Sequence, residues 1–424
     1  MTVSKQVRRY TLAFLVVVYT FNFIDRQILA ILLPSIKAEF GVGDGFLGFL
    51  AGTAFAIFYA TLGLPIALLA DRWNRRNLIA LSLALWSGMT AMSGAAGNVV
   101  QLALARVGVG IGEAGCSPAA HSMIADYYPP NERASAMGIF TLGISFGIMI
   151  AFLAGGWVAQ NIGWRQAFFM VGVPGVVLAT IFWATVPEPR RGLSEGRSDT
   201  HDRPTLLSVV LFLLKRRSFL GIAIGGGLAS FSGYAVTTLF PLYLIRSHGM
   251  SQADVGLYLG LTIGIAGGLG IVGGGYLADR IGRSSQRLAL TAVAAALASG
   301  WLLLFPVMLA GERWIVLVLF VVPAALTNFY LATTFAQTQS LVPLRMRGVA
   351  SAVMLFVLNI IGLGFGPWVT GSLSDALAPE FGSESMRYAI LITCATAYPL
   401  SALCYWFAGR SIEGDLARTG AAAA

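Results

Sequence analysis

GLPIALLADRWNRR, residues 63–76, ends a long apolar run with Ala-Asp-Arg and then two further arginines. The same pattern returns in the second half of the chain as GGGYLADRIGRSS, residues 273–285. In both copies a hydrophobic segment ends in an aspartate followed at once by basic residues. A repeated boundary of this kind indicates that the chain is built from a duplicated unit.

The composition places that unit in a membrane. Of the 424 residues, 57% are hydrophobic and only 11% are charged, whereas soluble domains carry roughly 25% charged residues. The 50 glycines suit closely packed membrane helices. The net charge of +9 does not indicate a nucleic-acid partner, because the positive charges alternate between loops in the manner described below.

Windows of about 20 apolar residues predict about twelve transmembrane helices. The predicted spans are 10–36, 46–70, 78–97, 99–125, 133–159, 165–186, 219–246, 252–278, 287–310, 313–341, 348–375 and 386–408. The polar stretch 187–218 divides them into six and six, so we expect an N-terminal bundle (1–186), a cytoplasmic linker (187–218) and a C-terminal bundle (219–424). Within the linker, residues 206–214 predict a short interfacial helix. The predicted fold is all-α and polytopic, with two six-helix bundles related by pseudo-two-fold symmetry.

The loop charges predict the orientation. Every second loop is basic, and cytoplasmic loops are the ones that carry an excess of Lys and Arg. The residues concerned are Lys5, Arg8, Arg9, Arg72, Arg75, Arg76, Arg280, Arg283, Arg287, Arg345 and Arg347. Both termini are therefore expected in the cytoplasm. The sequence contains no Asn-x-Ser/Thr acceptor for glycosylation, which favours a bacterial source and an inner-membrane location.

Four charged residues interrupt the apolar spans, two on the first and two on the fourth. Asp25 and Arg26 lie within FNFIDRQILAILLPSI, residues 21–36. Arg106 and Glu113 are seven residues apart and share one helix face. Similar depths predict that Asp25 and Arg106 are partners, with Glu113 deeper, and we expect all four residues to serve substrate binding. Asp25, Arg106 and Glu113 are also the predicted proton-coupling groups. The alternative is a structural ion pair, or an Arg26 that snorkels outward.

The second half offers only uncharged polar residues at matching depths. The candidate substrate contacts are Tyr234, Thr327, Asn328 and Asn359. Each alone is also explained as an ordinary interhelical hydrogen-bonding residue. A site with charged residues on one side and uncharged polar residues on the other suits an amphiphile. The candidates for an apolar wall of this site are Phe21, Phe23, Phe55, Phe58 and Tyr59.

The repeated boundary motif predicts a cytoplasmic gate. Asp71 and Asp279 end the second and eighth spans, where each would face basic residues and the positive end of a helix dipole. The basic candidates are Arg72, Arg75, Arg133, Arg280, Arg283, Arg345 and Arg347. Contacts of this kind would favour an outward-open state. The alternative is that the two aspartates only solvate helix ends.

The motifs resemble those of the major facilitator superfamily over nearly the whole chain. The loop motif formed by Gly275, Asp279, Arg280, Gly282 and Arg283 is similar to that superfamily's loop signature. Arg106, Gly110 and Gly112 resemble its fourth-helix signature. More narrowly, residues 22–36 and 106–138 are similar to the Spinster family. That resemblance implies a transporter of sphingolipids or lysophospholipids.

The sequence therefore predicts a secondary active transporter with alternating access, proton-coupled, for a lipid-like amphiphile. An alternative within the class is a carrier of a small organic anion or drug, and one outside it is a transporter-like sensor or a lipid scramblase. No enzyme is expected, and no cofactor or metal, because His121, His201 and His248 are scattered. We expect a monomer whose partners are its substrate, protons and membrane lipids, with no nucleic acid.

Overall fold

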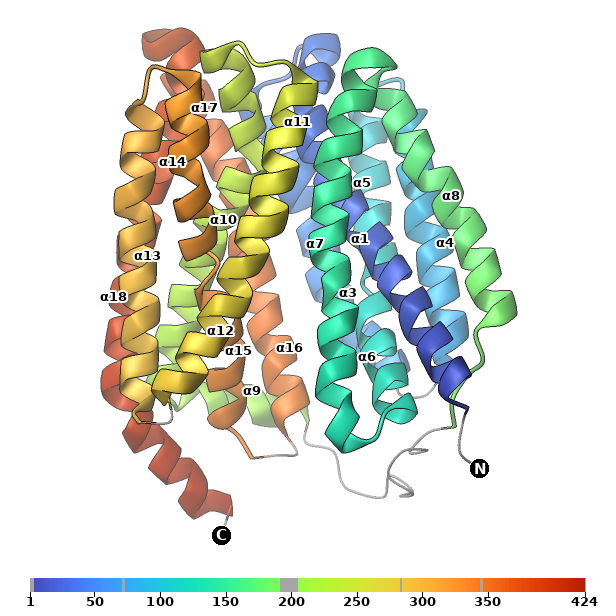
Figure 1. The fold of residues 1–424 in the computed structure, drawn as a ribbon, viewed down its shortest axis with the longest axis vertical. Helices are drawn as coiled ribbons and strands as arrows, with labels where there is room; N and C mark the ends of the chain where they lie inside the picture. The colour runs from blue at the N-terminus through green and yellow to red at the C-terminus, as the bar shows by residue number, and fades with distance from the viewer. Residues whose placement is uncertain (1–3, 71–72, 191–204, 283, 344–345, 424) are drawn as a thin grey trace. The chain divides into compact units, whose positions relative to one another are not determined.

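The protein is described from a computed structural model that covers residues 4–70, 73–190, 205–282, 284–343 and 346–423. Within these ranges the chain is built of helices and contains no strand (Figure 1). The predicted spans all appear as helices. Several of them are broken or locally widened where sequence alone predicts one continuous helix.

The described residues of the first half form nine helical segments. They are α1 (Lys5–Phe40), α2 (Asp44–Gly48), the π-helical segment η1 (Phe49–Thr53), α3 (Ala54–Ala70), α4 (Arg75–Gly94), α5 (Val99–Glu113), α6 (Cys116–Tyr127), α7 (Pro130–Asn161) and α8 (Trp164–Thr185). The predicted span 99–125 is thus two helices, α5 and α6, because the helix breaks at Ala114 and Gly115.

The second half repeats this arrangement after the short helix α9 (Leu206–Leu214), which lies where the sequence predicts an interfacial helix. The remaining helices are α10 (Arg217–His248), α11 (Gln252–Leu261), η2 (Thr262–Gly267, π-helical), α12 (Gly268–Gly282), α13 (Gln286–Leu309), α14 (Arg313–Leu326), α15 (Tyr330–Ser340), α16 (Arg347–Val357), η4 (Leu358–Phe365, π-helical), α17 (Gly366–Phe381), the short 3₁₀ turn η5 (Gly382–Glu384) and α18 (Ser385–Ala423). The last helix continues well beyond its predicted end at residue 408.

The chain divides into two compact units that exchange short segments. The first comprises Met1–Val42, Ala54–His201 and Ser251–Gly260, and the second comprises Gly43–Thr53, Asp202–Met250 and Leu261–Ala424. The second predicted span therefore begins in the second unit and continues in the first. The chain passes from one unit to the other directly after η1. The eighth span makes the reverse change just before η2. The predicted domain boundary at the linker remains a prediction.

In the first unit, α1 packs on α7 and α4 packs on α5 and α8. Glycine allows two of these approaches. A Cβ on Gly112 of α5 would lie 2.6 Å from the backbone nitrogen of Trp86 on α4, and one on Gly172 of α8 would lie 2.4 Å from that of Ala91. The exchanged segment is tied to α1, because the Gln252 amide donates to the backbone oxygen of Ile31 at 2.5 Å.

In the second unit, α10 and α13 pack on α18, and α17 packs on α2. Asp375 of α17 accepts hydrogen bonds from the backbone N–H groups of Asp44 and Gly45, each at 2.8 Å. N–H groups in the first turn of a helix have no acceptor within the helix, and a carboxylate at this end both accepts from them and stabilises the helix. The two terminal nitrogens of the Arg246 guanidinium donate one hydrogen bond each to the two carboxylate oxygens of Asp44, at 2.5 and 2.6 Å. The exchanged segment is thus anchored by charge at its start.

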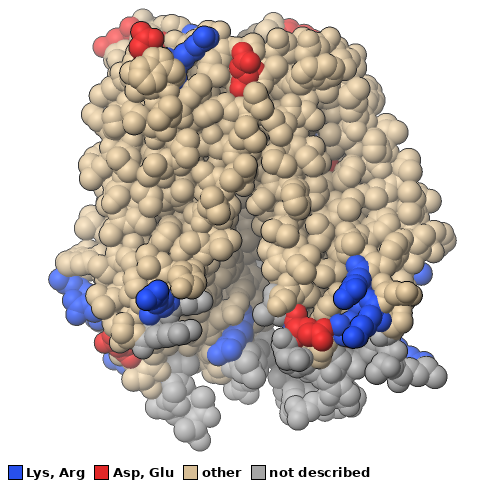
Figure 2. All heavy atoms as spheres, viewed as in Figure 1, with Lys and Arg blue, Asp and Glu red and all other residues tan. Residues whose placement is uncertain are grey.

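The surface of each unit matches a membrane protein. Charged side chains lie toward the two ends, and a wide band of uncharged residues separates them (Figure 2). Among the described residues, ten stretches are long and apolar enough to cross a membrane. One of the ten, Arg347–Arg418, contains two predicted spans, and the less apolar α4 is not among them. The chain is an integral, multi-pass membrane protein.

Candidate functional site

The four charged residues of the predicted site all lie in the first unit, and an ion pair joins two of them. Arg26 of α1 donates from Nε to the Glu113 carboxylate of α5 at 2.5 Å. The side chains of Arg26 and Glu113 are 9% and 0% exposed. A buried charge needs this kind of direct partner, because its desolvation is otherwise costly.

Aromatic rings surround the Arg26 guanidinium. Its central carbon lies 4.3 Å from the ring centre of Tyr59, 5.1 Å from that of Phe55 and 5.2 Å from that of Phe23. Ring faces attract cations, and more strongly so where water is excluded. Three of the residues predicted to form an apolar wall are therefore in contact with the charged site itself.

Asp25 and Arg106, the predicted partners, are in contact, but not through a hydrogen bond between their side chains. The Arg106 guanidinium donates from one terminal nitrogen to the backbone oxygen of Asp25, at 3.2 Å. Neither carboxylate oxygen of Asp25 has a hydrogen-bond partner of ordinary geometry among the described residues. Spacing placed the residues at similar depths. The Asp25 side chain, however, is directed toward α4, and Glu113 takes Arg26 as its partner.

Sequence reasoning missed the residues that face the two carboxylates. Trp86 and Thr90 of α4 approach Asp25, and Asn22 of α1 approaches Glu113. All three side chains are fully buried. The available signals were the polar residues inside apolar spans, with Asn22 three residues before Asp25 and Thr90 four after Trp86.

The four candidates of the second half lie in the second unit, and three of them bond to the backbone of the preceding helical turn. Thr327, Asn328 and Asn359 each donate a side-chain hydrogen bond to the carbonyl four residues earlier, at 2.7, 2.8 and 2.8 Å. Tyr234 lies on α10 and is half-buried. A substrate contact by any of the four remains a prediction.

The predicted gate residues are only partly visible. Asp71, Arg72, Arg283 and Arg345 lie outside the described residues, as does the side chain of Asp279. Arg280 and Arg347 are exposed at helix ends, and the Arg133 guanidinium donates to the backbone oxygen of Ala125 at 2.9 Å. The gate therefore remains a prediction.

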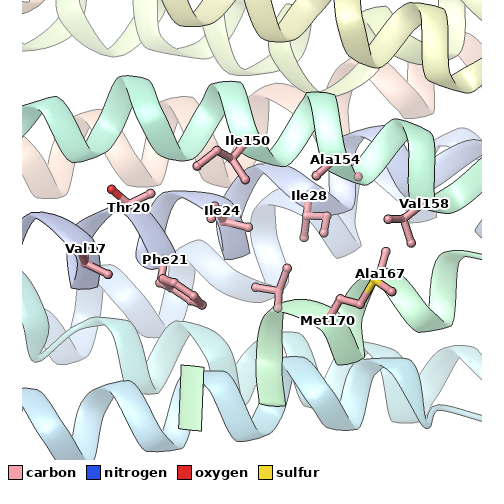
Figure 3. A pocket seen from close by; sticks show the side chains of 12 residues that line it. Val17, Thr20, Phe21, Ile24, Ile28, Ile150, Ala154, Val158, Ala167 and Met170 are labelled. Carbon is pink, nitrogen blue, oxygen red and sulfur yellow. The ribbon is translucent and has the colours of Figure 1, made fainter. Parts of the chain in front are cut away.

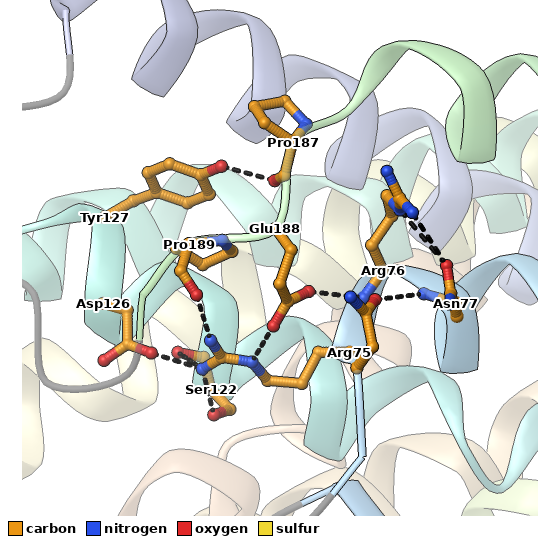
Figure 4. Close-up of polar contacts among 10 residues, drawn as sticks. Arg75, Arg76, Asn77, Ser122, Asp126, Tyr127, Pro187, Glu188 and Pro189 are labelled. Carbon is orange, nitrogen blue, oxygen red and sulfur yellow. Dashed lines mark hydrogen bonds and ion pairs between the residues drawn. The ribbon is translucent and has the colours of Figure 1, made fainter.

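Arg75, also predicted for the gate, is part of a polar cluster inside the first unit (Figure 4). It is 1% exposed and pairs with Asp126 of α6 and with Glu188, at 2.8 Å from Nε. Glu188 also accepts from the backbone N–H of Arg76 at 2.8 Å. The Tyr127 hydroxyl donates to the carbonyl of Pro187 at 2.6 Å. The cluster fixes the start of the linker to α4 and α6.

An apolar pocket of about 440 Å³ lies among α1, α7 and α8 of the first unit (Figure 3). It is lined by Val17, Thr20, Phe21, Ile24, Ile28, Ile150, Ala154, Gly155, Val158, Ala167, Met170 and Val171. Thr20 supplies the polar side chain of this lining, and its hydroxyl is bonded to the carbonyl of Val16 at 2.9 Å, so the lining offers no uncommitted polar group. Such a surface suits hydrocarbon.

A multi-pass helical protein with buried, paired charges inside its spans belongs to the class of membrane transporters. The chain belongs to the Major Facilitator Superfamily, whose family model matches residues 15–367. The predicted fold class is thereby confirmed, and the family consists of transporters rather than enzymes.

Two relatives and one solved structure are among the proteins that resemble the chain. An "MFS-type efflux pump" of Mycolicibacterium smegmatis is 34% identical over 410 residues, covering 95% of this chain and 92% of the pump. The crystal structure of a bacterial homolog of the human lysosomal transporter Spinster, inward-facing and unoccupied, has a TM-score of 0.85 and 29% identity over 97% of this chain and 99% of that one. A "Probable galactarate/D-glucarate transporter" of Bacillus subtilis is 29% identical over 66% of this chain and 67% of its own length. The predicted resemblance to a bacterial Spinster protein is confirmed.

Proposed function

We propose that this transporter works by alternating access and couples the movement of an amphiphile with an anionic head group to that of protons. The proposed location is the bacterial inner membrane, with both termini in the cytoplasm.

One stretch of α1 supports the amphiphile. Ile24 and Ile28 line the apolar pocket, while Asp25 and Arg26 between them belong to the charged site. The charged site and the apolar pocket thus lie at the same level of α1, on different faces of the helix, so a head group and a hydrocarbon chain would contact the same turn. This juxtaposition is the observation on which the proposal rests.

Arg106 is the proposed anchor for the head group. Its Nε is buried without a partner among the described residues, and its one resolved hydrogen bond goes to a backbone oxygen. A guanidinium presents a planar fork that matches the oxygens of a phosphate or carboxylate. Arg26, in contrast, is already bonded to Glu113.

The charge balance supports proton coupling. The site holds two carboxyl groups, Asp25 and Glu113, and two guanidinium groups, Arg26 and Arg106. With all four ionised it is neutral. A proton on either carboxyl leaves one positive charge in a buried place, which an anionic head group would neutralise. Proton binding and anion binding should therefore strengthen each other.

The second candidate is a small organic anion such as a sugar acid. It is favoured by the resemblance to the galactarate/D-glucarate protein and would use the same arginines. A polyhydroxylated anion needs many hydrogen-bonding partners. Against it, three candidate partners in the second unit are bonded to their own backbone.

Uptake into proteoliposomes tests both candidates. The panel contains a single-chain phospholipid, a sphingoid phosphate and galactarate, each with and without an imposed pH gradient. We expect gradient-driven movement of the single-chain lipids and its loss in Asp25→Asn and Glu113→Gln. Glu39→Gln, at the exposed end of the same helix, is the matched control and should retain it. Unchanged gradient-driven transport by both site variants would exclude the proposed coupling.

The pocket provides a second test that distinguishes the two substrates. Ala154→Phe fills the pocket and should slow movement of long-chain lipids more than that of short-chain analogues. Leu142→Phe is the control, because Leu142 is 49% exposed on the same helix and does not line the pocket. Galactarate uptake unaffected by Ala154→Phe, with no lipid movement at all, would favour the organic anion. Lipid movement that never exceeds equilibration would indicate a scramblase, and binding without movement a sensor.

A further inference from the structure

A buried donor pair on α4 faces the carboxyl group of Asp25. Trp86 and Thr90 are four residues apart and so share one face of the helix. Both are 0% exposed. Helix α4 lies beside α1 at this level, because a Cβ on Gly175 of α8 would lie 2.2 Å from the Ser87 hydroxyl and 3.6 Å from the Phe21 ring. These two contacts lie about one turn before Thr90 and Asp25, and both donor side chains act on the Asp25 carboxyl group. Neither the Trp86 indole N–H nor the Thr90 hydroxyl has a hydrogen-bond partner of ordinary geometry among the described residues. Buried donors are seldom left in this way without a reason.

The Thr90 hydroxyl, like those of Thr11 and Thr333, lacks the internal hydrogen bond that several other helical threonines of this chain make. Thr20, Thr237 and Thr327 each donate to the carbonyl four residues earlier, at 2.9, 2.9 and 2.7 Å. Such a bond satisfies a hydroxyl inside an apolar helix. Thr90 forgoes it. Its hydroxyl is therefore free for the carboxylate that it faces.

The surroundings of Asp25 include these two neutral donors and the Arg106 guanidinium, whose Nε is also without a partner among the described residues. On α5, Glu113 is paired with Arg26, and Arg106 bonds the backbone oxygen of Asp25 rather than its side chain. The neighbouring stretches of α7 and α8 contribute apolar residues, among them Ile150 and Met170. The charged groups that act on Asp25 are thus Glu113 and Arg106, with Arg26 beyond them.

We propose that Trp86 and Thr90 are positioning residues for Asp25, and that Thr90 changes its hydrogen-bonding role when Asp25 binds a proton. This inference rests on the proposed proton coupling. An indole N–H can only donate, whereas a hydroxyl can donate or accept. With Asp25 ionised, Trp86 and Thr90 each donate to one carboxylate oxygen. With Asp25 protonated, its O–H donates to the Thr90 hydroxyl oxygen, and Trp86 donates to the remaining carbonyl oxygen.

Ser87 supplies a matched control on the same helix. It is also fully buried, and its hydroxyl also lacks a partner among the described residues. It faces α8 instead, because a Cβ on Gly175 would lie 2.2 Å from its hydroxyl oxygen. Ser87→Ala therefore removes a buried, unpartnered hydroxyl from α4 without touching the environment of Asp25.

Infrared spectroscopy of the purified full-length protein tests the inference without any substrate. The carbonyl band of a protonated carboxyl is followed as the pH is changed, and Asp25→Asn and Glu113→Gln assign the bands to their residues. Both residues bond Asp25 in either protonation state, but a hydrogen bond to the ionised carboxylate is roughly twice as strong as one to the neutral acid, so its loss favours protonation. Thr90→Val and Trp86→Phe should therefore each move the midpoint of the Asp25 band to higher pH by about one unit. Thr90→Ser should restore the original midpoint, and Ser87→Ala should not change it.

The outcomes separate this inference from the proposed function. If no band disappears in Asp25→Asn, Asp25 takes up no proton in this range, and its part in the proposed coupling fails with the inference. If the Asp25 band is present but Thr90→Val and Trp86→Phe both titrate like Ser87→Ala, the donor pair is refuted and the coupling stands. Two different variants guard against the misfolding of either one.

Discussion

The ion pair between Arg26 and Glu113 should be the strongest single interaction of the charged site, and a double-mutant cycle can measure it. The perturbations are Arg26→Gln, Glu113→Gln and the two together. The Nε–Oε2 distance is 2.5 Å, and the side chains are 9% and 0% exposed. Removing one member of a buried pair leaves the other uncompensated, which costs about 3–5 kcal/mol.

The expected loss in the free energy of unfolding depends on which charged groups each variant leaves buried. Glu113→Gln keeps an oxygen that can accept from Arg26, so its cost should lie near the lower end, about 3 kcal/mol. The double variant leaves no buried charge from this pair. It should therefore be less destabilised than the sum of the single variants by about 2–3 kcal/mol.

The assay is equilibrium unfolding of the purified protein in mixed micelles of increasing denaturing-detergent content, followed by tryptophan fluorescence. The control cycle uses Arg165 and Glu39, an ion pair whose side chains are 31% and 42% exposed. Such a pair should show a coupling below about 1 kcal/mol. Costs at Arg26 and Glu113 that simply add would refute the pair and the charge balance built on it.

Three further predictions concern separate contacts. Arg106→Lys should weaken binding of a lipid phosphate about tenfold in a direct binding assay, because a point charge replaces a planar fork; equal affinity would mean that Arg106 does not hold the head group. Glu188→Gln should destabilise the protein by about 1–3 kcal/mol in the same unfolding assay, since it weakens contacts to Arg75 and Arg76; the exposed Glu132→Gln should cost less, and an equal effect would argue against the cluster. Gly112→Ala should cost about 1–3 kcal/mol, because its Cβ would lie 2.6 Å from backbone of α4, whereas Gly88→Ala meets nothing within 4 Å and should be close to neutral; no difference between them would contradict the close packing of α4 and α5.

The sequence predicted the helices well because hydropathy and length alone constrain a membrane span. It did not predict the breaks. The change from α5 to α6 at Ala114 and Gly115, and the π-helical turns η1, η2 and η4, lie within runs whose composition resembles that of their neighbours. Such local widening depends on tertiary packing, which a window of residues does not contain.

The charged site was predicted in its membership and not in its pairing. Helical spacing placed Arg106 and Glu113 on one helix, seven residues apart. The similar depth of Asp25 and Arg26 along the first span predicted that they lie close to this pair. The partner of each carboxylate is decided by side-chain direction. Arg26 turns to Glu113 and Asp25 turns to α4, and neither direction follows from spacing.

The exchanged segments also have a consequence for biosynthesis. The first unit includes Ser251–Gly260, so it cannot be completed when the linker leaves the ribosome. The second unit needs Gly43–Thr53, a segment made near the start of synthesis. A chain cut within the linker should therefore yield two fragments that each lack a piece of their own unit. We expect such fragments to acquire protease resistance when produced together, and to be degraded when produced singly.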